Sequence, residues 1–140
     1  MKITTLAVLL FVATLNVFAQ DNEQEKTFIS RLEAFQKTND MNELPTIIWY
    51  DKSPGLFRLL TSDNCEALIL RGIKSVKFES VPKVMLEPTT IDGVEYVPNL
   101  EPYKMVAIEY QKEIKNGSSG FSMITGMKDG KIIICGLKKK

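Results

Sequence analysis

The chain has 140 residues, with 18 basic side chains, 17 acidic side chains and no histidine. A charge balance this close to neutral gives no electrostatic footprint for nucleic acid. Without histidine the chain cannot form a Ser-His-Asp or Cys-His triad, a histidine general base or a histidine metal site, and two cysteines alone cannot form a four-ligand zinc site. We therefore expect no metal and no cofactor, and we assign no catalytic residue.

The first twenty residues predict a secretory signal peptide. Lys2 precedes an apolar run from Leu6 to Ala13, and Val17-Phe18-Ala19 places a small residue before a cleavage site. The run is shorter than the roughly 20 apolar residues of a membrane-spanning helix. We expect residues 1–19 to be removed and residues 20–140 to form a single domain. That domain would work outside the cytoplasm, periplasmic or secreted, with no stable membrane anchor after cleavage.

The first half of the mature chain has the periodicity of helices. Asn22 can cap a helix, and the helical spacing of Phe28, Leu32 and Phe35 predicts one from about Glu23 to Thr38.

Two further helices are expected before the strands begin. The first runs from near Asn42 into Ile47-Ile48-Trp49-Tyr50, and Pro45 is acceptable only in its first turn. The second starts with Ser53 as the cap and Pro54 as the first helical position. Its apolar stripe is Leu56, Leu59 and Leu60, and Gly72 is a suitable residue to end it.

Beyond Gly72 the pattern changes to alternation, which is typical of strands. Val76 and Phe78 fall on one side of a half-buried strand. Val84-Met85-Leu86 and Val94-Glu95-Tyr96-Val97 flank an Asp92-Gly93 turn and could pair as a hairpin.

Three longer strands close the chain. They are Lys104 to Ile114, Phe121 to Met127 and Lys131 to Leu137, and the last two are joined by Asp129-Gly130, a strong hairpin signal. We expect them to form an antiparallel meander.

Helices followed by strands indicate an α+β domain, in which N-terminal helices pack on one face of a curved antiparallel sheet. The order resembles the nuclear transport factor 2-like (SnoaL-like) family of small cone-shaped domains. Three segments carry the resemblance: the capped helix with Phe28, Leu32 and Phe35, the stretch Trp49-Tyr50-Asp51 leading into Ser53-Pro54, and the closing hairpin Met127 to Ile132.

The resemblance implies that the curved sheet could enclose an apolar pocket. Buried aromatic side chains at alternating positions are commonly plain core, but the following six could line such a pocket: Trp49, Tyr50, Phe78, Tyr110, Phe121 and Met123. Its ligand would be apolar and uncharged, because no buried basic group is evident to hold an anion. Family enzymes use pocket carboxylates and tyrosines, but alternation sends Glu109 and Tyr110 to opposite faces of their strand.

The two cysteines, Cys65 and Cys135, allow two interpretations. In an oxidising compartment they could form a disulfide that closes about 70 residues. Alternatively, they are two buried thiols that behave as small hydrophobic side chains.

Three classes of function are open. The first is non-enzymatic binding of a small apolar ligand or a protein partner through the concave side of the sheet. The second is an enzyme of the SnoaL-like cone family that uses carboxylate or tyrosine acid-base chemistry. The third is an accessory or structural role in the cell envelope, which includes a homodimer.

Overall fold

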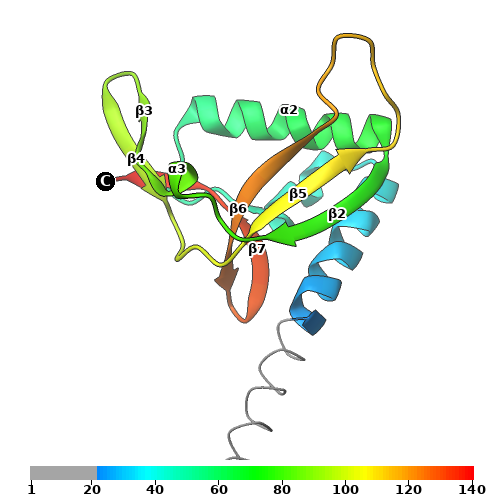
Figure 1. Cartoon of the computed structure of the whole chain (residues 1–140), viewed down its shortest axis with the longest axis horizontal. Helices are drawn as coiled ribbons and strands as arrows, with labels where there is room; N and C mark the ends of the chain where they lie inside the picture. The colour runs from blue at the N-terminus through cyan, green and yellow to red at the C-terminus, as the bar shows by residue number, and fades with distance from the viewer. Residues whose placement is uncertain (1–21) are drawn as a thin grey trace, which may run out of the picture.

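The computed structural model describes residues 22–140 (Figure 1). The predicted leader and its cleavage site after Ala19 lie outside the described residues. Within the described part of the chain, no helix combines the length and the apolar character needed to cross a membrane.

Four helical segments are described. An N-terminal helix covers residues 22–38 and buries Phe28, Leu32 and Phe35, which confirms the first predicted helix. The 3-10 helix η1 follows at Met41–Thr46, α2 spans Gly55–Arg71 and the short α3 spans Lys83–Leu86.

Eight strands form two open sheets. They are β1 (Ile48–Trp49), β2 (Ile73–Glu79), β3 (Thr89–Ile91), β4 (Val94–Pro98), β5 (Met105–Tyr110), β6 (Gly120–Lys128), β7 (Lys131–Cys135) and β8 (Leu137–Lys139). Five of them pair in the order β1-β7-β6-β5-β2, and three in the order β3-β4-β8. β1 runs parallel to β7, whereas the other pairs are antiparallel. The larger sheet is therefore mixed, and the expected all-antiparallel sheet is wrong in this respect.

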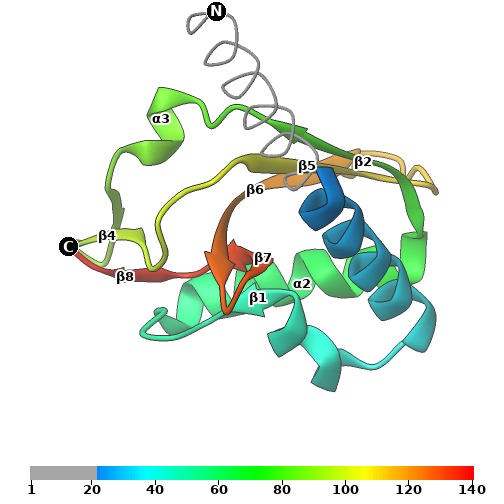
Figure 2. The ribbon, with the colours of Figure 1, turned by 90° about the horizontal axis from the view of Figure 1, so that it is seen from below.

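The N-terminal helix and α2 lie on the same side of the layer formed by β2, β5 and β6 (Figure 2). The core fills the space between these helices and the sheet. Its largest fully buried side chains include Phe28, Leu32, Leu68, Ile108 and Ile134. The α+β class, with helices on one face, is as predicted.

The segment around Ile48 is a strand, and the prediction of a helix there is wrong. Ile48 lies opposite Ile134 in the parallel β1–β7 pair. The backbone N–H of Ile134 donates to the carbonyl of Ile47 over 2.9 Å. A short strand lets the buried Ile47 and Ile48 join the sheet, which local helix propensity cannot anticipate.

Residues 83–86 form the helix α3, and the strand predicted there is wrong. Pro82 is the N-cap of α3, and the Met85 N–H donates to the Pro82 carbonyl over 3.0 Å. The Asp92-Gly93 turn is present, but it joins β4 to β3. The proline at position 82 fits the start of a helix, where its missing N–H costs no hydrogen bond.

The closing hairpin is confirmed. Asp129 and Gly130 both have positive φ, 51° and 74°, as a tight turn between twisted strands requires. β5, β6 and β7 form the expected antiparallel meander.

Gly136 marks the point where the chain leaves the larger sheet at the end of β7 and enters the smaller one as β8. A Cβ at this position would lie 2.2 Å from the Ser53 Oγ and 2.3 Å from the Trp49 carbonyl oxygen. The Leu137 N–H donates to the Ser53 Oγ over 2.9 Å, and the Asn99 N–H donates to the Gly136 carbonyl over 3.1 Å. Only glycine allows this close approach of three segments.

Candidate functional site: an apolar groove

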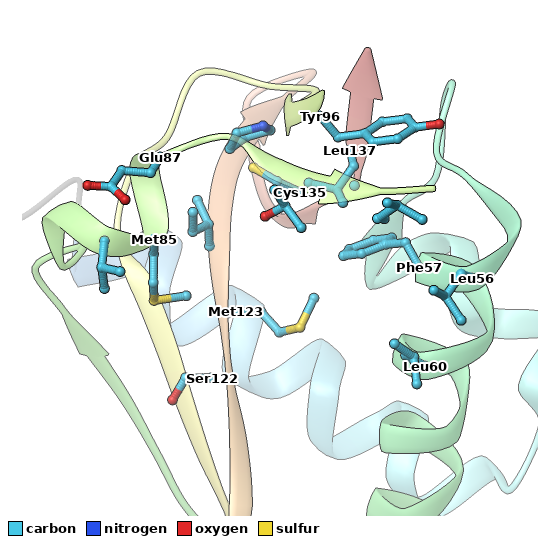
Figure 3. Close-up of a pocket in the computed structure, with 16 residues that line it drawn as sticks. Leu56, Phe57, Leu60, Met85, Glu87, Tyr96, Ser122, Met123, Cys135 and Leu137 are labelled. Carbon is cyan, nitrogen blue, oxygen red and sulfur yellow. The ribbon is translucent and has the colours of Figure 1, made fainter. Parts of the chain in front are cut away.

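A groove of about 600 Å³ lies between α2, α3, the three-stranded sheet and β6 (Figure 3). We call it the apolar groove, because its lining is dominated by leucine, methionine, valine, isoleucine and aromatic side chains.

The first wall of the apolar groove is the start of α2. Leu56 and Leu60 line it and are 50% and 55% exposed. We expected these leucines to form the buried stripe of the helix, which is wrong. The helix turns Cys65 and Leu68 toward the core instead. α2 thus buries Thr61, Cys65, Leu68 and Arg71 on its core side, and it is apolar again on the groove side at its start.

The second wall comes from α3 on the far side of the groove. Met85 and Val84 line it, and Val84 is 71% exposed. A four-residue helix that leaves a valine this open buries little of its own apolar surface.

The third wall is one face of the three-stranded sheet. Thr89 lies opposite Tyr96 in the β3–β4 pair, and Pro98 lies opposite Leu137 in the β4–β8 pair. Directly opposed residues share a face, and all four of these side chains line the apolar groove.

Met123 and Cys135 complete the groove at the larger sheet. In Figure 3, Met123 points from β6 toward Leu60. Burial raises the pKa of the Cys135 thiol to about 12, although a backbone hydrogen bond with Leu100 opposes this. The thiol is therefore neutral near pH 7 and acts as a small apolar group.

Polar groups are few in the groove. Glu87 is the one charged side chain among the described residues that line it, and Thr89 and Ser122 contribute hydroxyl groups. No lysine or arginine of residues 22–140 belongs to this lining.

Of the six residues predicted to line a pocket, only Met123 lies in the apolar groove. Phe78 packs edge to face on Phe28, with 5.7 Å between ring centroids. Phe121 packs on Tyr110 at 5.9 Å. Phe28 and Tyr110 belong to the core that fills the space under the sheet, and Phe78 and Phe121 pack against it.

Tyr110 has a structural role, because both its hydroxyl and its ring contact other residues of the protein. Its hydroxyl donates to the Asn64 carbonyl over 3.2 Å, and the guanidinium of Arg71 lies 4.0 Å from its ring centroid. Burial raises the pKa of Tyr110, although the charge of Arg71 opposes the shift. Glu109 is exposed on the other face and accepts a hydrogen bond from the Ser75 hydroxyl over 2.8 Å. The two residues thus face opposite ways, as alternation predicted.

Trp49 and Tyr50 lie away from the groove lining. The ammonium group of Lys128 stands 4.8 Å from the Trp49 ring centroid. The Tyr50 hydroxyl shares a hydrogen bond of 2.5 Å with the Thr61 hydroxyl, and burial raises the pKa of Tyr50. Both side chains have protein partners.

The two cysteines are free and buried in the structure. Cys65 belongs to the core, whereas Cys135 faces the apolar groove. The sequence left a disulfide and two buried thiols open, and the structure contains two buried thiols. Within residues 22–140, no cluster of three or more His, Cys, Asp or Glu side chains is placed to hold a metal ion.

A second hollow, of about 460 Å³, lies on the outer face of β2, β5 and β6. Its lining is mainly polar and includes Lys77, Glu79 and Glu109. This is the solvated face of a sheet whose other face is buried.

Comparison of the chain with family models, with curated proteins and with solved structures finds no match. The function is therefore argued from the groove itself. Sequence reasoning missed it because it placed the leucines of α2 in the core. The signal that could have found it is Leu56-Phe57-Arg58-Leu59-Leu60, which is apolar over more of the helix circumference than a single buried face requires.

Proposed function

We propose that this protein is a non-enzymatic binding protein that takes a small apolar ligand in the apolar groove. The observation that carries the proposal is that exposed apolar side chains of two separate helices, Leu56 and Leu60 on α2 and Val84 on α3, line one groove of about 600 Å³. Contiguous apolar surface of this kind, rimmed by a few polar groups, is typical of a ligand site.

The free energy gained when a ligand covers these exposed side chains is modest but sufficient for binding. Full burial of a leucine side chain stabilises by about 1.5 to 3 kcal/mol. Leu56 and Leu60 are each about half exposed. Covering both would therefore contribute about 2 kcal/mol, and the valine and methionine side chains add to this.

We also propose that the protein works outside the cytoplasm, on the strength of the leader sequence. A relationship to the nuclear transport factor 2-like cones is part of the same proposal. The placement of two helices on one face of a five-stranded sheet supports it (Figure 2). Two features differ from the expectation: β1 is parallel to β7, and the space under the sheet is filled by core side chains.

The test compares two leucines of the same helix. Leu60 lines the apolar groove, whereas Leu70, which is 67% exposed, does not. We expect saturable binding of the neutral fluorophore N-phenylnaphthylamine to the wild type, seen as enhanced emission. Leu60→Asn should weaken binding about fivefold, because it removes apolar contact worth about 1 kcal/mol.

Leu70→Asn is the matched control and should bind as the wild type does. Circular dichroism spectra of both variants should match the wild type, since both positions are exposed. Absence of saturable binding by the wild type, or equal loss in both variants, would overturn the proposal.

A second candidate is an accessory role in which a protein surface covers the same region. Leu59 is exposed beside the apolar groove but outside its lining, so apolar surface continues beyond what a small ligand would cover. For a homodimer, sedimentation analysis should show a mass that rises with concentration, and Leu59→Asn should shift it back to the monomer. A constant monomer mass over the tested range would count against it.

A further inference from the structure

We propose that the ligand of the apolar groove is a small single-chain amphiphile with a cationic head group. This inference rests on the proposed function and adds the chemical class of the ligand. Its basis is the charge distribution among the described residues of the lining: one carboxylate, from Glu87, and no lysine or arginine.

Glu87 is placed to meet one end of a ligand. It directly follows α3 as its C-cap residue and is exposed. In Figure 3 it lies on the side of the groove away from α2, at the rim, with its carboxylate pointing outward, away from Met123, while Leu56 and Leu60 face the groove from α2. A chain lying from the leucines past Met123 would therefore bring its head group to the solvent-exposed rim of the groove that carries the Glu87 carboxylate. The Thr89 and Ser122 hydroxyls also belong to the lining.

No basic side chain of the described residues neutralises Glu87. The described ion pairs join Lys26 to Glu23, Lys104 to Glu25, Lys128 to Asp129 and Lys140 to Glu95. Lys83, one helical turn before Glu87, forms no ion pair with it. The carboxylate is thus available to a cation.

Arg58 lies on α2 next to the groove residue Phe57 but is held elsewhere. Its Nε donates to the Ser53 carbonyl over 3.2 Å, and its Nη2 donates to the Tyr50 carbonyl over 3.1 Å. Its guanidinium also stands 5.7 Å from the Tyr50 ring centroid. The guanidinium of Arg58 is therefore held by the turn before α2. An anionic head group would find no basic partner among the described residues that line the groove.

The rest of the groove favours the apolar part of the same ligand. The Cys135 thiol stays protonated, and the remaining walls are leucine, valine, methionine and aromatic surface. A carboxylate head group would lie beside another carboxylate in partly apolar surroundings, which is unfavourable. A fatty acid is therefore the wrong class of ligand, although its chain would fit the same walls.

The experiment uses three probes with the same decyl chain: decyltrimethylammonium, decanol and decanoate. Each displaces N-phenylnaphthylamine from the full mature protein at low ionic strength, below its micelle concentration. We expect decyltrimethylammonium to bind at least about threefold more tightly than decanoate, as suits one exposed charge pair. Added salt should shrink the difference.

Glu87→Gln should abolish the preference for the cation while leaving decanol binding unchanged. The matched control is Glu113→Gln, which removes the same charge from an exposed residue of the β5–β6 connection and should keep the preference.

The outcomes separate the two proposals. Suppose that the dye binds and that its binding is weakened by Leu60→Asn. If decanoate then binds as tightly as decyltrimethylammonium, or if Glu87→Gln leaves the preference intact, the cationic ligand class is wrong, but the proposal of a ligand-binding groove is kept. The cationic class is equally wrong if none of the decyl probes displaces the dye. If the dye itself does not bind, the proposed function fails and this inference fails with it.

Discussion

The two buried thiols should make the protein sensitive to alkali. Burial raises the pKa of both Cys65 and Cys135 from 9.0 to about 12. Below pH 9 the folded and unfolded states both hold these protons, so the stability is fully present. Between pH 9 and 12 the unfolded chain releases them and the folded state does not, so stability falls as pH rises.

The size of the effect follows from these two pKa values. At pH 10 one such thiol lowers the free energy of unfolding by about 1.4 kcal/mol relative to pH 7, and two lower it by about 2.8 kcal/mol. Since domains of this size are stable by only about 5 to 15 kcal/mol, this loss is readily measured.

The assay is urea unfolding under reducing conditions at pH 7 and pH 10, followed by the fluorescence of Trp49, the single tryptophan of the chain. Cys65→Ala will be less stable than the wild type at pH 7, because it opens a small cavity in the core. Between the two pH values, however, it should lose about 1.4 kcal/mol less than the wild type. Cys135→Ala should behave likewise, and the double variant should show the sum.

Equal losses in the wild type and in all three variants would refute this reasoning. A thiol count on the denatured protein, purified without reductant, provides a separate control. Two reactive thiols per chain are expected from the structure, whereas none would show that Cys65 and Cys135 are joined.

Two further substitutions test the packing. Gly136→Ala should cost about 3 kcal/mol or more, because the new methyl group overlaps atoms of three other residues, Trp49, Ser53 and Asn99. Gly130→Ala should cost only about 1 to 2 kcal/mol, since its φ of 74° is strained for alanine but its Cβ meets nothing; equal losses in thermal unfolding would contradict the account of Gly136. Arg71→Met should cost about 2 kcal/mol, because it removes the hydrogen bond to the Lys112 carbonyl and the contact with the Tyr110 ring. Urea unfolding that gave an unchanged midpoint for Arg71→Met would show that these contacts contribute nothing.

The strands of the second half were the most predictable part of the fold. Asp92-Gly93 and Asp129-Gly130 each place two residues with positive φ between paired strands. Few residue pairs adopt this geometry cheaply, so the turn chemistry alone locates the hairpins. Strict alternation then assigns Val106, Ile108 and Tyr110 to the buried face.

Short apolar runs were not predictable. Ile48-Trp49 became a strand and Val84-Met85-Leu86 became a helix, each the opposite of what we expected. A run of three or four apolar residues contains too few positions to show a period of two or of 3.6. The secondary structure of each run is decided by contacts outside it. The first run pairs with β7, and the second follows the N-cap residue Pro82.

The candidate site was hidden for a related reason. Aromatic residues at alternating positions suggest a pocket and a core equally well. Tyr110 turned out to be part of the core, and Phe78 and Phe121 pack against it. The groove is instead built from Leu56 and Leu60, whose exposure depends on how α2 is rotated about its axis. That rotation is set by Cys65, Leu68 and Thr61 packing inward, and a helical pattern alone does not rank the competing faces.

The pairing of β1 with β7 also sets the order of events when the chain is made. Ile48 lies opposite Ile134, 86 residues later (134 less 48), and the groove wall formed by β4 waits for β8. Contacts between such distant segments form late and slowly. The larger sheet and the apolar groove can therefore be completed only after the last strands, β7 and β8, have been synthesised. For a protein that we propose is exported, late completion of the sheet would suit a chain that has to cross the membrane before it folds.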